Sequence, residues 1–176
     1  MIDTMATTVN KLNILDDFLP RNEFENIKQI MLSNNFPWFL NDGKTDHLNP
    51  TESLVDYQFN HLFYENGLAN SDYYYLLSPI LRAIHPLALV RIKANLNPYI
   101  NSIEHYPHHT DYDNEKITTG IFYLTTTDAP TEFQDGTKCQ CVENRFVSFN
   151  ALQAHRGTLL TNKKFRCLIN FNYIKE

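Results

Sequence analysis

The stretch "LALVRIKANL", residues 87–96, alternates polar and apolar side chains over its second half. Arg91, Lys93 and Asn95 share one side of this pattern, and the apolar residues between them share the other. A period of two is typical of a β-strand with only one face in an apolar core. The stretch therefore predicts a strand that presents three polar side chains on a common face.

Further strand-like segments follow as far as residue 174. They are short, carry β-branched or aromatic residues, and are separated by turn residues: "TTGIFYLTT", "TEFQ", "KCQCVE", "RFVSFN", "HRGTLLT" and "FRCLINFNYI". Short strands at this spacing are typical of a sandwich or barrel. Residues 88–174 are therefore predicted to form an antiparallel double-stranded β-helix, or jelly roll.

The first half of the chain has a different pattern. "RNEFENIKQIMLSNN" has apolar residues at helical spacing, and "SDYYYLLSPILRAIHP" is also predicted to be helical, with a kink or break at Pro79. Two aromatic-rich stretches, "FPWFL" and "LVDYQFNHLFY", are predicted to be extended. We predict one domain over residues 1–176, mostly β with some α, in which an N-terminal helical support layer (1–87) backs the jelly-roll core (88–174).

Composition and charge argue against several classes of function. The net charge is −5 with no block of like charge, so no nucleic-acid or anionic-membrane surface is predicted. No stretch reaches the roughly 18 apolar residues of a membrane span, and the N-terminus lacks the pattern of a signal peptide. The three cysteines are an odd number, which argues against a disulfide framework and favours the cytoplasm.

Residues 108–113 read "HHTDYD" and are the densest group of metal-binding side chains in the chain. If strand geometry holds here, His109 and Asp111 point to the same side, while His108 points to the other. An imidazole and a carboxylate on one face can bind a single metal ion. His155, at the start of a later predicted strand, is the leading candidate for a third ligand.

A predicted hairpin relates this third ligand to an arginine. With "TNKK" (161–164) as its turn, His155 would face Asn170 on the following strand. Arg166 has the parity of Asn170, so it would lie on the same face, about 13 Å along the strand. An arginine on the inner face of an apolar strand needs an anionic partner. A small dicarboxylate would fit between the guanidinium and the metal.

Two histidines and one carboxylate with open positions are the ligand set of the non-heme Fe(II) oxygenases. "HHTD", followed by "HRGTLLTNKKFRCLINFNYI", resembles the H-x-D…H…R signature of the 2-oxoglutarate- and Fe(II)-dependent oxygenases. The run from "VRIKANL" to "FVSFNALQAHRG" resembles their small prolyl-4-hydroxylase-like branch, which includes proteins carried by bacterial viruses. The resemblance covers roughly residues 88–174, with Ala129 and Pro130 where many members have two glycines beside the substrate mouth.

The resemblance implies roles for individual residues. His109, Asp111 and His155 match the iron ligands, and Arg166 matches the residue that grips the distal carboxylate of 2-oxoglutarate. Tyr123 matches a tyrosine that often shares this carboxylate. Four more residues are candidates for contact with the cosubstrate or the substrate: Asn170, Asn172, Asn95 and Lys93.

The implied activity is a dioxygenase reaction that uses Fe(II), O2 and 2-oxoglutarate, with ascorbate as a candidate additive. It hydroxylates a C–H bond and releases succinate and CO2, and the resemblance favours a prolyl residue in a peptide or protein. Nucleic-acid demethylases of the superfamily typically carry a second arginine where this chain has Asn172. Three alternatives stay open: a hydroxylase of a free amino acid or small metabolite, a cupin-like barrel that binds metal and ligand without turnover, and a zinc-loaded hydrolase.

Overall fold

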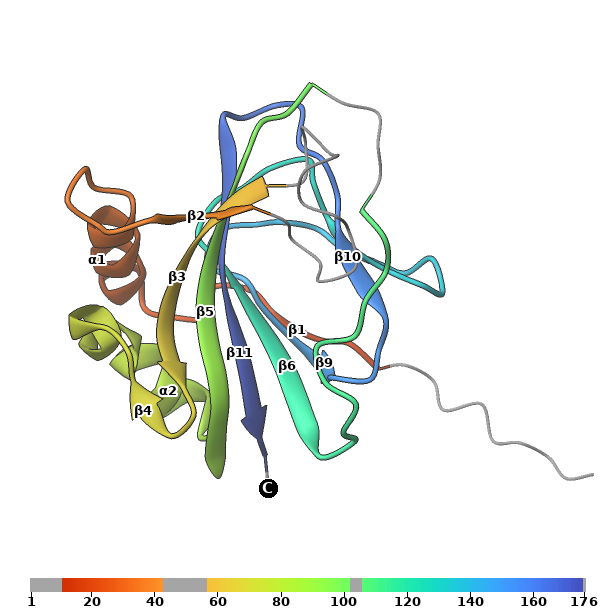
Figure 1. Ribbon diagram of the computed structural model, residues 1–176, viewed down its shortest axis with the longest axis horizontal. Helices are drawn as coiled ribbons and strands as arrows, with labels where there is room; N and C mark the ends of the chain where they lie inside the picture. Colours follow the sequence, from red (N-terminus) through yellow and green to blue (C-terminus); the bar gives the residue numbers. More distant parts are fainter. Residues whose placement is uncertain (1–10, 43–56, 102–105, 176) are drawn as a thin grey trace, which may run out of the picture.

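Two antiparallel β-sheets form the body of the molecule (Figure 1), and the computed structural model describes residues 11–42, 57–101 and 106–175. The helices and strands in chain order are β1 (Asn13–Leu15), α1 (Arg21–Met31), β2 (Phe39–Asp42), β3 (Tyr57–Glu65), β4 (Leu68–Ala69), the 3-10 helix η1 (Asp72–Leu77), α2 (Ser78–Ile84), β5 (Ala88–Pro98), β6 (Ile117–Tyr123), β7 (Thr131–Phe133), β8 (Lys138–Cys139), β9 (Phe146–Asn150), β10 (His155–Gly157) and β11 (Phe165–Ile174). This mostly β architecture confirms the predicted jelly-roll fold class.

The larger sheet has eight strands in the order β1-β9-β6-β11-β5-β3-β2, with β4 paired to β3. The smaller sheet has three strands in the order β10-β7-β8. β1, β2, β3 and β4 come from the first half of the chain, so this half extends the large sheet as well as supplying the helices. The aromatic-rich stretches predicted to be extended contribute β2 and β3.

The helices cover one face of the large sheet, as Figure 1 shows for α1 and α2. α1 buries Phe24, Ile27 and Met31 along one stripe, and these side chains share a core cluster with Phe122 and Phe171 of the sheet. Burial of such a stripe is the main source of stability for an amphipathic helix. The helical layer therefore fixes one face of the sheet and leaves the other for the pocket.

The second face of the large sheet looks toward the small sheet. Ile92 and Ala94 of β5 are fully buried in the helical core, so the alternating residues of β5 face the opposite way. A second apolar cluster joins the two sheets and includes Tyr123, Phe133 and Leu168. The polar face predicted for residues 87–96 is confirmed and lies on the side of the small sheet.

The predicted hairpin between β10 and β11 is wrong. His155 lies opposite Phe133 of β7 in the small sheet, whereas Asn170 lies opposite Lys93 of β5 in the large sheet. Residues 158–164 therefore carry the chain from one sheet to the other. The turn residues in "TNKK" signal a change of direction, but they do not specify which strand becomes the neighbour.

The helical region before β5 breaks where the sequence predicted. η1 ends at Leu77 and α2 begins at Ser78, with Pro79 in the first turn of α2, where a missing backbone N–H is tolerated. No helix in the described part of the chain is long and apolar enough to cross a membrane. The three cysteines are free and buried.

Candidate metal centre

His109 and His155 are brought together by their own backbones. His109 lies outside the regular strands, but its N–H donates to the His155 carbonyl and the His155 N–H donates to the His109 carbonyl, both at 2.9 Å. This isolated antiparallel bridge places the two imidazole centroids 4.8 Å apart. The segment around His109 thus joins the edge of the small sheet at the position of His155.

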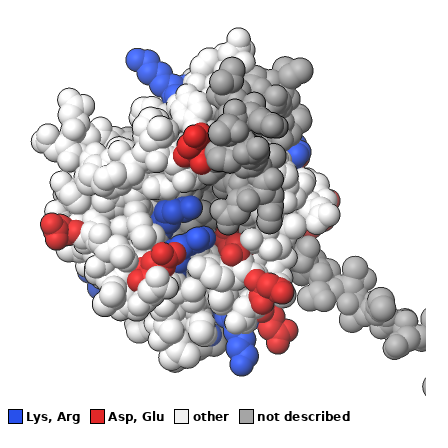
Figure 2. All heavy atoms as spheres, in the orientation of Figure 1, with Lys and Arg blue, Asp and Glu red and all other residues white. Residues whose placement is uncertain are grey.

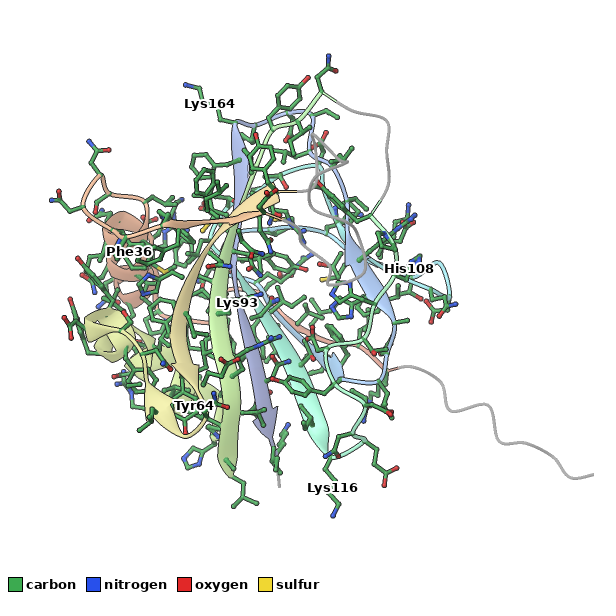
Figure 3. All side chains as sticks on the ribbon, in the orientation of Figure 1. Phe36, Tyr64, Lys93, His108, Lys116 and Lys164 are labelled. Carbon is green, nitrogen blue, oxygen red and sulfur yellow. The ribbon has the colours of Figure 1, made fainter. Side chains whose placement is uncertain are left out.

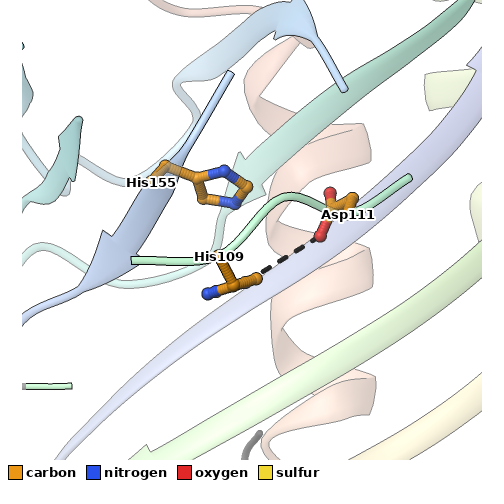
Figure 4. A group of neighbouring side chains, drawn as sticks. All are labelled: His109, Asp111 and His155. Atoms are coloured by element: carbon orange, nitrogen blue, oxygen red, sulfur yellow. Dashed lines mark ion pairs between the residues drawn. The ribbon is translucent and has the colours of Figure 1, made fainter. Parts of the chain in front are cut away.

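The side chains of His109, Asp111 and His155 converge on one point (Figure 4). One ligand atom of each lies within 4.8 Å of those of the others, and His109 Nε2 is 4.0 Å from Asp111 Oδ1. Ligand atoms about 2.1 Å from a common ion are roughly 3 Å apart when adjacent, so side-chain rotation would draw the three atoms onto an ion. The donor set and its convergence fit a metal with three positions left open.

His155 and Asp111 are oriented by hydrogen bonds on their far sides. His155 Nδ1 lies 3.0 Å from the Gln153 carbonyl, and donation to this carbonyl leaves Nε2 with its lone pair toward the metal position. Asp111 Oδ2 accepts from Thr119 Oγ1 at 2.7 Å and from Asn172 Nδ2 at 3.0 Å. Oδ1 is then the oxygen that faces the histidines.

The electrostatic environment favours the forms that bind a metal. Burial and the neighbouring His155 lower the pKa of His109, which keeps its imidazole neutral. Burial acts to raise the pKa of Asp111, but His155 and the hydrogen bonds from Thr119 and Asn172 outweigh it and hold this pKa below its usual range. A neutral imidazole and an ionised carboxylate are the ligand states of these side chains.

Arg166 lies beyond the three ligands on β11 and is only 3% exposed. Its Nη2 donates to Thr131 Oγ1 at 2.8 Å, while its buried Nε has no hydrogen-bond partner. Within the described ranges, no carboxylate forms an ion pair with Arg166. A buried guanidinium is costly without an anion, so the structure fits a ligand carboxylate at this end of the pocket.

Tyr123 is behind Arg166 and does not line the pocket. It is fully buried, its hydroxyl shares a 2.8 Å hydrogen bond with Thr131 Oγ1, and its ring lies 5.5 Å from the Arg166 guanidinium carbon. Burial raises the pKa of Tyr123, so the phenol stays protonated. Thr131 therefore links Tyr123 to Arg166. The sequence contains no signal for this role, because it requires β7 of the small sheet to approach β11 of the large sheet.

The three candidate ligands and Arg166 line one pocket of about 400 Å³. Asn170, Asn95 and Lys93, the further candidates from the sequence, also line it. Figure 2 shows basic side chains inside a hollow on this face, and Figure 3 shows Lys93 over the middle of the large sheet.

Two other residues lie outside the pocket. Asn172 does not line it and instead contacts Asp111 from behind. His108 is also absent from the pocket lining and lies near β10 in Figure 3. The structure thus gives Asn172 a supporting position, and His108 is not among the residues that line the pocket.

Comparison with protein-family models and with curated protein sequences finds no match. Solved structures do match. A prolyl-4-hydroxylase from Pseudomonas putida is 14% identical with a TM-score of 0.56, over 96% of this chain and 95% of that one. A prolyl hydroxylase from Trichoplax adhaerens, solved with a peptide fragment of the hypoxia inducible factor oxygen degradation domain, is 15% identical with a TM-score of 0.66, over 94% and 84%.

The epimerase SnoN of nogalamycin biosynthesis, described as non-heme and alpha ketoglutarate dependent, is also similar. It is 11% identical with a TM-score of 0.66, over 94% of this chain and 79% of SnoN. At these identities the comparisons show that the chain has the fold of the 2-oxoglutarate- and Fe(II)-dependent oxygenases, prolyl hydroxylases among them. The neighbours differ in the reactions that their names give, so the fold is compatible with several substrates.

Proposed function

We propose that this protein is a 2-oxoglutarate- and Fe(II)-dependent dioxygenase that hydroxylates a C–H bond. The observation that carries the proposal is the pairing, in one pocket, of the His109–Asp111–His155 cluster with a buried arginine that has no protein carboxylate beside it. The first element suits Fe(II) with open positions, and the second suits the distal carboxylate of a dicarboxylic cosubstrate. Likeness of fold to the oxygenases supports the same assignment.

In this proposal the protein side chains hold and orient the reactants. His109, Asp111 and His155 hold the iron, and Arg166 holds the far end of 2-oxoglutarate through charge-assisted hydrogen bonds. Thr131 in turn keeps the guanidinium in place. Fe(II) bound there with 2-oxoglutarate and O2 would supply the oxidising power for a hydroxylation in which 2-oxoglutarate becomes succinate and CO2 and one oxygen atom is inserted into the substrate.

For the substrate, we propose a prolyl residue in a peptide or protein, acted on in the cytoplasm. The resemblance of residues 88–174 to the prolyl-4-hydroxylase-like branch supports this choice, as does the presence of prolyl hydroxylases among the similar structures. The net charge of −5 disfavours a phosphate-rich substrate. The three free cysteines support a reducing compartment.

The activity is tested by incubating the protein with 2-oxoglutarate, O2, ascorbate and either Fe(II) or Zn(II). The proposal expects succinate only with Fe(II), and a gain of one oxygen on proline in peptides from a lysate, measured by mass spectrometry. Tight Zn(II) binding with hydrolysis of an ester or amide would favour a zinc hydrolase instead. Binding of 2-oxoglutarate without succinate under any condition would favour a cupin-like binding protein.

A further inference from the structure

Side-chain amides make up much of the pocket wall on the large sheet, beside the basic residues Arg91, Lys93 and Arg166. Six Asn and Gln residues line the pocket, and they come from four neighbouring strands: Asn41 (β2), Gln58 and Asn60 (β3), Asn95 and Asn97 (β5), and Asn170 (β11). Apart from threonines, the lining includes two residues with aliphatic side chains, Ile121 and Leu168. A wall of this composition is far more polar than the usual small-molecule site, which is mostly apolar.

Strand register shows that these amides form a band across four strands, in which Asn170 lies opposite Lys93 and Asn97 lies opposite Arg166. Asn41 lies directly opposite Gln58, and Asn60 lies directly opposite Asn95. Directly opposed residues of antiparallel strands share a face. From β2 to β11 the band crosses three strand spacings of about 4.8 Å, or roughly 14 Å, which is the length of about four extended residues.

Part of this band lacks hydrogen-bond partners within the protein. Asn95 Oδ1 and Asn170 Oδ1 are buried and have no hydrogen-bond partner, and Asn95 as a whole is only 7% exposed. An unpartnered buried amide oxygen is destabilising, because it has lost its hydration and gained no hydrogen bond in exchange. A ligand that reaches this wall is therefore expected to supply hydrogen bonds to it.

A side-chain amide offers one acceptor and two donor hydrogens, and it carries no charge. A peptide bond has the matching groups, one donor and one acceptor, and is also uncharged. A free amino acid instead presents two charged ends to a short span of the wall. A band of six amides over roughly 14 Å is thus better matched to several consecutive peptide groups than to one small zwitterion.

We propose that the band Asn41, Gln58, Asn60, Asn95, Asn97 and Asn170 binds the main chain of an extended peptide substrate. This inference rests on the proposed dioxygenase function and specifies how its substrate is recognised. Recognition through peptide groups selects an extended segment, and binding then depends little on the side chains of that segment. The protein would then accept proline in several sequence contexts and would not accept free proline.

The test uses the full-length protein and capped pentapeptides with a central proline and varied neutral neighbours. Peptide binding is measured by calorimetry with Mn(II) and 2-oxoglutarate, which gives a readout without turnover. Each peptide N–H in turn is then replaced by N-methyl, which removes a donor and leaves the peptide side chains unchanged. Free L-proline is measured in parallel.

We expect at least one N-methyl position to weaken binding about 3- to 10-fold, the usual effect of one lost hydrogen bond. Asn60→Leu, which removes the amide at similar volume, is expected to raise the peptide Kd and KM by a similar factor, with little change in kcat and in 2-oxoglutarate affinity. Asn22→Leu on the exposed surface of α1 is the matched control and is expected to change neither constant.

Peptides that bind equally well with every N–H methylated would overturn the inference, and so would hydroxylation of free L-proline without peptide binding. An Asn60→Leu protein indistinguishable from Asn22→Leu would count equally against it. Absence of Fe(II)-dependent succinate formation from 2-oxoglutarate alone, together with absence of 2-oxoglutarate binding, would instead contradict the proposed function itself. The N-methyl series uses the unmodified protein, so it stays decisive even if a variant folds poorly.

Discussion

Asp111 is the most constrained of the three candidate ligands. Its side chain is 5% exposed, against 43% for the side chain of His109, and one of its oxygens accepts two hydrogen bonds. His109 is held by its backbone bridge to His155 and by a hydrogen bond between its ring and the Pro107 backbone. The site therefore combines a fixed carboxylate with a more accessible imidazole on the side of the pocket.

Replacing any one ligand by alanine is expected to abolish iron binding. His109→Ala, Asp111→Ala and His155→Ala each leave two ligands, too few to hold Fe(II) in the proposed geometry. Iron content after reconstitution and the melting temperature without metal are the measurements, and we expect folded, iron-free proteins. His108→Ala is the control because His108 does not line the pocket. Full iron content in a ligand variant would remove that residue from the proposed set.

Arg166→Ala is expected to weaken 2-oxoglutarate binding about 30- to 1000-fold, the effect of losing a charge-assisted carboxylate contact worth about 2–4 kcal/mol. Iron affinity is expected to stay the same. Arg166→Lys is expected to recover only part of the loss because it lacks the planar fork of donors. Calorimetric titration of 2-oxoglutarate measures both, and an unchanged affinity in Arg166→Ala would assign the distal carboxylate to another basic residue of the pocket.

Gly157 leaves the space that the Arg166 guanidinium occupies. A Cβ at this position would lie 3.0 Å from Arg166 Nη1, closer than ordinary van der Waals contact. Gly157→Ala is expected to shift the guanidinium and weaken 2-oxoglutarate binding by a factor smaller than that of Arg166→Ala. The same titration of 2-oxoglutarate measures this effect. An affinity of Gly157→Ala equal to that of the unmodified protein would show that the arginine moves aside at no cost.

The residues of the site were predictable from the sequence to different degrees. The H-x-D spacing, a later histidine and the arginine of the resembled signature indicated four side chains that the structure brings into one pocket. The strand-parity argument for Arg166 does not hold, because it relied on a hairpin that the structure does not have. Thr131 was not predictable, because its contact with Arg166 depends on how β7 and β11 approach each other across the two sheets. Tyr123 was predicted to line the pocket, but it lies behind Thr131, to which its hydroxyl is hydrogen-bonded.

At the scale of elements, β6 and β11 support Asp111 together. Thr119 of β6 lies directly opposite Asn172 of β11, and their side chains contact each other and the same carboxylate oxygen. Both residues are almost fully buried, at 0% and 1% exposure. Strand pairing thus places two donors where they fix the orientation of the carboxylate.

Thr119→Val removes the hydroxyl donor at nearly constant volume. We expect metal affinity to fall about 10- to 100-fold, as is common when a partner of a metal ligand is lost. Thr119→Ser keeps the hydroxyl and is expected to restore most of the affinity. Thr118→Val, at the neighbouring position of opposite parity, is the control. Titration with Mn(II) measures all three, and equal affinity for Val and Ser at position 119 would rule out the positioning role.

The order of the strands shows where sequence reasoning reaches its limit. Alternation along 87–96 correctly predicted which side chains of β5 share a face, since strand parity is a local property. The pairing of β10 with β7 depends on contacts between residues far apart in the sequence. The predicted hairpin at 161–164 followed the local turn signal and therefore gave the wrong neighbour.

At the scale of the whole molecule, Asn144 attaches the segment before α1 to the jelly roll. Its side chain accepts from the Leu19 N–H at 3.0 Å and donates to the Leu19 carbonyl at 2.8 Å. Its carbonyl accepts from the Phe18 N–H at 2.9 Å, and the Phe18 ring stacks on Phe146 at 4.7 Å. The backbone of Asn144 has a φ of 59°, a conformation that asparagine tolerates better than most residues.

Asn144→Ala is expected to reduce the free energy of unfolding by about 2–4 kcal/mol, from two lost hydrogen bonds and a strained backbone. Asn144→Gly relieves the strain and is expected to cost less. Asn66→Ala is the matched control, because Asn66 is exposed with a φ of 55° and tests the backbone alone. Denaturant titration measures all three. An Asn144→Ala protein no less stable than Asn66→Ala would show that this attachment does not stabilise the fold.

The central claim is that one pocket holds both Fe(II) and 2-oxoglutarate. The most direct measurement is the visible absorption spectrum of the protein under anaerobic conditions, with Fe(II) and 2-oxoglutarate added separately and then together. We predict a weak charge-transfer band that appears only when both are present, is lost in His155→Ala, and needs a higher 2-oxoglutarate concentration in Arg166→Ala. A protein that binds Fe(II) but shows no such band at saturating 2-oxoglutarate, or a band unchanged in His155→Ala, would contradict the claim.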